Sequence, residues 1–203
     1  MNPREKISAI LLGLGLILAL LPLTGNRSFT VSPQKVLTDA LDKNSYFTVD
    51  QVARFIATED TSVQLIDLRP SEEFVTLNIP GSVNMPYNQF IEIAPGTISG
   101  TGTIRYILYS NGDIEANNAY VIAKGLKIRN VYVMRGGLNE WFNTVMNSHF
   151  KGERISVREN ALYENRKRAG QIFTEMNSLP DSLKKKYFEA RHMAAKKLDG
   201  GCE

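Results

Sequence analysis

Ser110 occupies a position where this sequence could display a nucleophile. The apolar residues 106–109 precede it, a turn follows at residues 111–113, and an Ala-rich stretch with helical period comes next. A strand, a tight loop and a helix in this order place the loop at the carboxyl edge of a sheet, where α/β proteins usually bind their ligands. Residues 110–115 are therefore the candidate site.

This candidate site carries two carboxylates and no cation. Its residues are Ser110, Asn111, Gly112, Asp113, Ile114 and Glu115. Two unit charges about 5 Å apart repel each other by roughly 1–3 kcal/mol at effective dielectrics between those of water and a protein surface. The stretch therefore disfavours an anionic ligand such as thiosulfate or phosphate.

A serine nucleophile would also need a neighbouring base, because its hydroxyl ionises only at very high pH. The two histidines, His149 and His192, both lie beyond residue 145, and no G-x-S-x-G pattern marks Ser110 as the nucleophile of a hydrolase. The sequence thus disfavours Ser–His catalysis. We also expect neither a metal nor a cofactor.

Outside this site, the composition is that of a folded globular protein. The chain has 203 residues, of which 43% are hydrophobic and 22% charged, and its net charge is +3. We expect an anchor or signal segment at residues 1–30, one domain at residues 31–150, and a basic helical extension ending in GGC at residues 151–203. The aromatic residues of the extension are spaced for packing, so nucleic-acid binding is not expected.

An uncharged and almost wholly apolar segment lies between Lys6 and Arg27. Its length is close to that needed to cross a bilayer as a helix. We expect residues 7–25 to anchor the chain in a bacterial inner membrane as a single pass, with a cleaved secretion signal as the alternative. Arg4 and Lys6 keep the N-terminus cytoplasmic, which would place the remaining chain in the periplasm.

Strand and helix patterns alternate along the expected domain. Helices are expected at residues 34–43, 50–58, 71–76, 87–93, 115–125 and 138–146, and strands at residues 46–49, 63–68, 104–109 and 131–134, with one more short strand after the turn at residue 81. Asp50 is expected to cap its helix, and residues 94–102 to form a surface loop. The alternation predicts a parallel sheet with helices on both faces.

Three stretches resemble the signatures of the rhodanese-like family, in the same order and at matching distances. They are VQLIDLRPSEEFVTLNIPGSVNMP, ILYSNGDIEANNAYVIAKGL and VYVMRGGLNEW, within roughly residues 45–145. The resemblance implies an α/β fold, doubly wound, with a mostly parallel five-stranded sheet. In enzymes of this family, a cysteine on the loop after the fourth strand takes sulfur from a donor as a persulfide and passes it to an acceptor.

Position 110 departs from the family pattern, because serine stands where that cysteine is expected. A persulfide requires a thiolate, and a hydroxyl cannot form one. Gly112 also falls one place earlier than the glycine of the family's usual C-x-x-G spacing, which indicates a shortened or reshaped loop. The resemblance gives Asp67 and Arg69 a supporting role in fastening loops. We therefore expect no thiosulfate sulfurtransferase activity, and instead a non-catalytic module held at the membrane for protein interaction or weak ligand sensing.

Cys202 is the only thiol of the chain and follows two glycines at its end. An intramolecular disulfide is therefore impossible. The alternative function is sulfur transfer through this mobile thiol, as a persulfide carrier for a partner enzyme. A crosslink between two chains and an inert terminal cysteine are the other possibilities.

The extension shows helical periodicity at residues 161–176 and 182–197, with a break at Pro180. We expect a helical hairpin that packs on itself or on the preceding domain. The alternatives are docking to a protein partner in the membrane or periplasm, and binding to anionic lipid headgroups through Lys184, Lys185 and Lys186. Adjacent lysines on a helix point in different directions, which weakens the lipid alternative.

Overall fold

The computed structural model describes residues 43–98, 102–150, 156–180 and 182–184, together with the single positions Asn2, Pro3, Arg4, Leu12, Ser32, Gln34, Thr38 and Lys186. Apart from such single positions, the anchor expected at residues 7–25 and the helix expected at residues 34–43 lie outside the described residues. So do Cys202 and most of the second helix of the extension. Within the described part of the chain, no helix is both long enough and apolar enough to span a bilayer.

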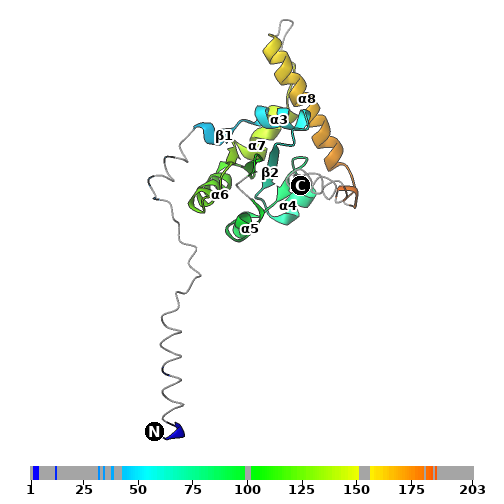
Figure 1. Ribbon diagram of the computed structural model, residues 1–203. Helices are drawn as coiled ribbons and strands as arrows, with labels where there is room; N and C mark the ends of the chain where they lie inside the picture. The colour runs from blue at the N-terminus through cyan, green and yellow to red at the C-terminus, as the bar shows by residue number, and fades with distance from the viewer. Residues whose placement is uncertain are drawn as a thin grey trace, which may run out of the picture.

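The strands and helices alternate along the chain from residue 43 onward (Figure 1). In order they are η1 (Lys43–Ser45), β1 (Tyr46–Phe47), α3 (Val49–Ala57), β2 (Val63–Asp67), α4 (Ser71–Thr76), β3 (Val83–Asn84), η2 (Tyr87–Gln89), α5 (Phe90–Thr97), β4 (Arg105–Tyr109), α6 (Asp113–Gly125), β5 (Val131–Met134), α7 (Gly137–Trp141), the π-helical turn η3 (Phe142–Met146) and α8 (Val157–Asn177).

The strands form one five-stranded sheet in the order β1-β5-β4-β2-β3, and every pairing is parallel. This confirms the expected α/β fold with a parallel five-stranded sheet. β2 and β4 are central, and Asp67 at the end of β2 is in register with Tyr109 at the end of β4. The residues that follow these two strands therefore emerge side by side at the carboxyl edge of the sheet, which is where Ser110 lies.

Two hydrophobic cores lie on opposite faces of the sheet. One core holds Val52 of α3, Trp141 of α7 and Phe173 of α8, and the other holds Phe90 of α5 and Tyr120 of α6. Figure 1 accordingly shows α3, α7 and α8 together on one side of the sheet, and α5 and α6 on the other. Buried apolar surface contributes about 25 cal/mol per Å², so both cores stabilise the sheet.

Helix α8 packs on the domain, as expected for the first helix of the extension. Ala169 and Phe173 are almost wholly buried, and the Phe173 ring lies 6.0 Å from that of Trp141. Two polar links reinforce the packing. The Arg166 guanidinium donates to the Asp50 carboxylate of α3 at 2.5 and 2.8 Å, and the Asn177 side chain exchanges hydrogen bonds of 2.9 and 3.0 Å with the backbone of Asn78.

The expectation that Asp50 caps its helix was wrong. The N-cap of α3 is Thr48, whose hydroxyl accepts the Gln51 backbone N–H at 3.2 Å while the Gln51 side chain accepts the Thr48 backbone N–H at 2.8 Å. This reciprocal pair satisfies two helix-terminal donors. Asp50 is left free to bind Arg166, a partner 116 residues away.

Further boundaries differ from expectation. The strand expected at residues 46–49 ends at Phe47, because Thr48 already caps α3, which begins at Val49. Residues 94–97 belong to α5 rather than to a loop, and α5 contains Pro95. Ala94 and Ile98 are buried in the core, and that burial holds the last turn of α5 in place. The helix expected at residues 138–146 is α-helical only to Trp141 and continues as η3.

Candidate functional site

Ser110 directly follows β4 and is only 2% exposed. Its hydroxyl donates a hydrogen bond to the Glu115 carboxylate. Because α6 already begins at Asp113, the loop between β4 and α6 contains only Ser110, Asn111 and Gly112. Half of the stretch expected to be loop is thus the first turn of a helix. The hydroxyl is directed at a carboxylate of its own chain and is shielded from solvent.

The second carboxylate of the stretch fastens the opposite loop. Asp113 accepts the Gly136 backbone N–H at 2.6 Å. The same loop donates the backbone N–H of Leu138 to the Ser110 carbonyl at 2.9 Å and that of Asn139 to the Asn111 carbonyl at 3.0 Å. The segment that contains Ser110 is therefore tied to the start of α7 by backbone as well as side-chain bonds.

Gly137 makes this close approach possible. Its φ is +57°, a left-handed conformation that disfavours residues with a Cβ. A Cβ at this position would lie 2.9 Å from the carbonyl carbon of Asn111 and nearer still to the Ser110 carbonyl oxygen. Gly137 thus lets two backbone segments come into contact beside Ser110.

Asp67 and Arg69 form a buried ion pair next to this loop. The Arg69 Nε and Nη2 atoms donate to both carboxylate oxygens of Asp67, with a shortest distance of 2.6 Å, and Nη2 also donates to the Leu77 carbonyl at 2.6 Å. Burial alone would lower the pKa of Arg69, but the hydrogen bonds and charge of Asp67 outweigh it and raise this pKa. The Arg69 guanidinium is therefore engaged by Asp67 and by the Leu77 carbonyl, and it holds the segment after α4 in place.

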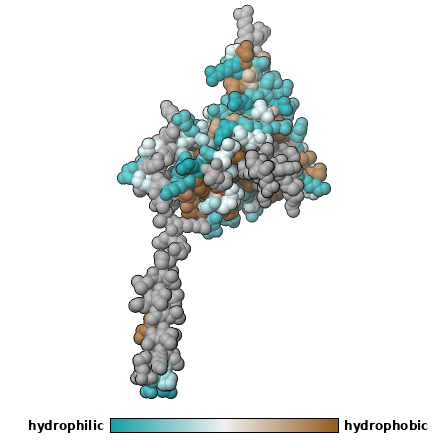
Figure 2. All heavy atoms as spheres, in the orientation of Figure 1, coloured by the Kyte–Doolittle hydropathy of each residue, from teal (hydrophilic) through white to brown (hydrophobic). Residues whose placement is uncertain are grey.

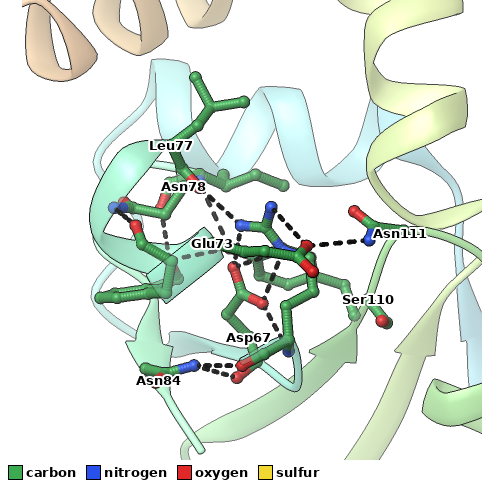
Figure 3. Close-up of polar contacts among 12 residues, drawn as sticks. Asp67, Glu73, Leu77, Asn78, Asn84, Ser110 and Asn111 are labelled. Atoms are coloured by element: carbon green, nitrogen blue, oxygen red, sulfur yellow. Dashed lines mark hydrogen bonds and ion pairs between the residues drawn. The ribbon is translucent and has the colours of Figure 1, made fainter. Parts of the chain in front are cut away.

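Asn111 turns toward this ion pair, while Ser110 does not (Figure 3). The Asn111 side chain donates to the Glu73 carboxylate at 3.0 Å, and Glu73 in turn lies 3.8 Å from Arg69. In Figure 3 the Ser110 side chain is directed away from the Asp67 carboxylate. Asn111 therefore connects the end of β4 to α4 through Glu73, whereas Ser110 bonds only to Glu115 among the side chains that the structure describes.

Tyr109, the last residue of β4, stabilises the same carboxyl edge of the sheet. Its hydroxyl is fully buried, donates to the Ser82 hydroxyl at 2.9 Å and accepts the Ile79 backbone N–H at 3.2 Å. Burial, helped by the negative charge of Asp67, raises the pKa of Tyr109 well above its usual value. The phenol therefore stays neutral at physiological pH and acts as a structural clamp.

This geometry is poorly suited to nucleophilic chemistry. Glu115 has the position of a base for Ser110, but Ser110 is only 2% exposed and its hydroxyl already donates to that carboxylate. The buried guanidinium of Arg69 already binds Asp67 and Leu77. In the described part of the chain, no group of three His, Cys, Asp or Glu side chains is placed to hold a metal ion.

Sequence reasoning missed Glu115 as the partner of Ser110, because it sought a histidine base. Glu115 is the third residue of α6, a position from which Glu side chains often reach back toward the helix start. That position was the available signal. The contact between Asn111 and Glu73 gave no such signal, since these two residues belong to different strand–helix units.

Comparison with known proteins gives a family match for the central part of the chain. The family model described as "Rhodanese-like domain" matches residues 48–144. No curated protein matches the chain.

Several solved structures are similar to this chain. A protein of unknown function from Rhodopseudomonas palustris, described as a possible tyrosine phosphatase, is 18% identical, with 58% of this chain and 94% of that chain covered at a TM-score of 0.46. A rhodanese-like domain from Anabaena is 14% identical, with 56% and 92% covered at 0.44. A single-domain sulfurtransferase from Saccharomyces cerevisiae is 19% identical, with 49% and 89% covered at 0.40.

Proposed function

Residues 48–144 form a rhodanese-like domain, and from this premise we propose that the protein is a non-catalytic module used for protein interaction. The observation that carries the proposal is the hydrogen bond from the buried Ser110 hydroxyl to Glu115. Sulfur transfer through a persulfide needs a thiolate at this position. Here the position holds an oxygen that is already engaged with a carboxylate.

The electrostatics around position 110 support the same proposal. Glu115 places a negative charge directly beside it, and Asp113 lies two residues earlier on the same helix. A negative charge at this distance disfavours both a thiolate and a bound anionic sulfur donor. The fold has therefore been kept while two requirements of persulfide chemistry are absent from this loop.

A thiosulfate-to-cyanide assay of the purified protein tests the proposal. We expect no thiocyanate above the uncatalysed rate. Activity that survives Cys202→Ala would contradict the proposal, because it would place the chemistry in the Ser110 loop. Activity that disappears with Cys202→Ala would favour the alternative function, in which the terminal thiol carries sulfur.

Gain-of-function variants separate the effect of the missing thiol on activity from the effect of the Glu115 charge. Ser110→Cys alone should give little activity, because Glu115 still disfavours the thiolate. The double variant Ser110→Cys with Glu115→Gln should be on the order of tenfold more active than Ser110→Cys, since one charge has been removed. If the single variant is as active as the double variant, the charge argument is wrong.

The membrane-held part of the proposal is supported by the uncharged segment at residues 7–25 and the basic residues before it. We propose that the rhodanese-like domain stands on the periplasmic side of a bacterial inner membrane, where its partner would also be found. Alkaline extraction of membranes should leave the protein in the pellet. Protease added to spheroplasts should digest the domain, and a domain protected until lysis would refute this orientation.

A further inference from the structure

A groove runs along α8, and no residue of the Ser110 loop lines it. A cavity of about 570 Å³ lies between η3 with its following residues and the first half of α8. A second cavity of about 390 Å³ continues along the helix and shares Ser148, Tyr163 and Arg166 with the first. Residues 156–177, which form one wall, lie outside the part matched by the rhodanese-like family. The groove is therefore an addition to that domain.

Several polar side chains that line the groove have no hydrogen-bond partner among the residues that the structure describes. They are Asn143, Asn147, Ser148, His149 and Tyr163. In the first cavity the charged side chains are already engaged, since Arg166 binds Asp50 and Glu159 closes the α8 capping box with Ser156. The second cavity is also lined by Lys167 and Glu175. The groups available in the first cavity are thus uncharged donors and acceptors, which suit a ligand that presents amides there rather than ions.

The π-helical turn η3 produces this wall of the groove. An extra residue per turn is rare in helices and occurs frequently at functional sites. Val145 of η3 is buried in the core, whereas Asn143 and Asn147 are exposed and line the cavity. The turn therefore keeps one side chain in the core while it presents two amides to the groove. Figure 2 shows the surface around the upper part of α8 as mainly hydrophilic, with a few hydrophobic residues.

The length of the groove indicates an elongated ligand. Its lining residues on α8 extend from Glu159 to Glu175, which corresponds to about 24 Å at the helical rise per residue. An extended chain of about seven residues has that length. In the first cavity Phe150 and Tyr163 pack edge to face with ring centroids 5.3 Å apart, and Phe150 is 55% exposed. This pair offers an apolar contact.

We propose that this groove binds an extended peptide segment of a partner protein, about seven residues long. An apolar side chain of the peptide packs against Phe150 and Tyr163, and the Asn143 and Asn147 amides bond to uncharged backbone of the peptide. The inference rests on the proposed role in protein interaction and goes beyond it, because it names the surface and the form of the partner. The Ser110 loop takes no part in this binding.

Selection from a phage-displayed library of random heptapeptides on the full-length protein in detergent micelles tests the proposal. Enriched peptides would be synthesised with a fluorescent label, and their affinities measured by fluorescence anisotropy. We expect a shared apolar position among them. We expect roughly tenfold weaker binding to Asn147→Ala, from the loss of about two hydrogen bonds. Tyr163→Ala should weaken binding at least as much.

Asn160→Ala is the matched control, since Asn160 is exposed on α8 outside both cavities. It should bind as wild type does, and so should Asn111→Ala in the Ser110 loop. The proposal is overturned if no peptide is enriched, if binding is lost with Asn111→Ala but not with Asn147→Ala, or if peptides shortened to three residues bind equally well. The sulfurtransferase assay does not depend on peptide binding. If the groove binds no peptide, the proposal that the Ser110 loop is non-catalytic can still be tested separately.

Discussion

An alanine at Gly137 tests whether close backbone contact holds the Ser110 loop. Gly137 has a φ of +57°, and a Cβ there would meet backbone atoms of Ser110 and Asn111 rather than a side chain that could move aside. Those atoms directly follow β4, a central strand of the sheet. The substitution must therefore push the start of α7 away from the loop.

The expected magnitude follows from three contributions. A left-handed conformation costs about 1–2 kcal/mol for a residue with a Cβ. Overpacking adds about 1–3 kcal/mol. The displacement also weakens the bonds from the backbone N–H groups of Leu138 and Asn139 to the loop, worth about 0.5–1.5 kcal/mol each. We expect Gly137→Ala to lower the free energy of unfolding by about 3–8 kcal/mol, a large part of a typical total.

Gly112→Ala is the matched control on the other side of the loop. Gly112 has a φ of −138°, and a Cβ there would meet nothing within 4 Å. We expect its free energy of unfolding to stay within about 1 kcal/mol of wild type, because a small capping loss offsets a gain from the less flexible unfolded chain. Urea unfolding can be followed by the fluorescence of Trp141, the only tryptophan, which is fully buried. Equal transition midpoints for the two variants would refute the argument.

Three other perturbations test the packing of α8 and the edge of the sheet. Phe173→Ala should lower the free energy of unfolding in urea by about 3–5 kcal/mol, whereas the exposed Glu175→Ala should change it by less than about 0.5 kcal/mol, and similar losses would contradict the core position of Phe173. A double-mutant cycle with Asp50→Asn and Arg166→Met should give a coupling energy of about 1 kcal/mol that shrinks in 1 M salt, since both side chains are about a quarter exposed. Burial raises the pKa of Tyr109 in the folded state, so the unfolded chain loses this proton first and stability should fall as the pH rises above about 10. Tyr109→Phe should lose stability less steeply above this pH, and equal pH slopes would exclude the buried phenol as the cause.

Local patterns determined most of the elements. The bounds of α4 and β5 agree with the predicted residues, because a buried strand and a short helix are each specified by the apolar period of a few adjacent residues. The place of Ser110 after a central strand follows from the same reasoning. The serine itself, and with it the absence of a thiol at this position, is fixed by the sequence alone.

Contacts between distant segments decided the rest. Thr48 rather than Asp50 caps α3, because Thr48 and Gln51 form a local capping box, and Asp50 binds Arg166 of α8 across 116 residues of sequence. The end of α5 was predicted as a loop, since Pro95 breaks the local pattern while burial of Ile98 in the core holds the last turn. At α5 a local preference was outweighed by a tertiary contact, whereas at α3 the partner of Asp50 could not be read from neighbouring residues.

The sequence by itself determined which atoms stand at the candidate site: an oxygen at position 110, two carboxylates after it, and a glycine pair further along the chain. Only the tertiary structure decided what these atoms do. It directs Ser110 to Glu115, brings Gly137 against the loop, and sets α8 beside η3 to form the groove. The physical reason is that hydrogen bonds and close packing depend on distances in space, which the spacing of residues along a chain does not specify.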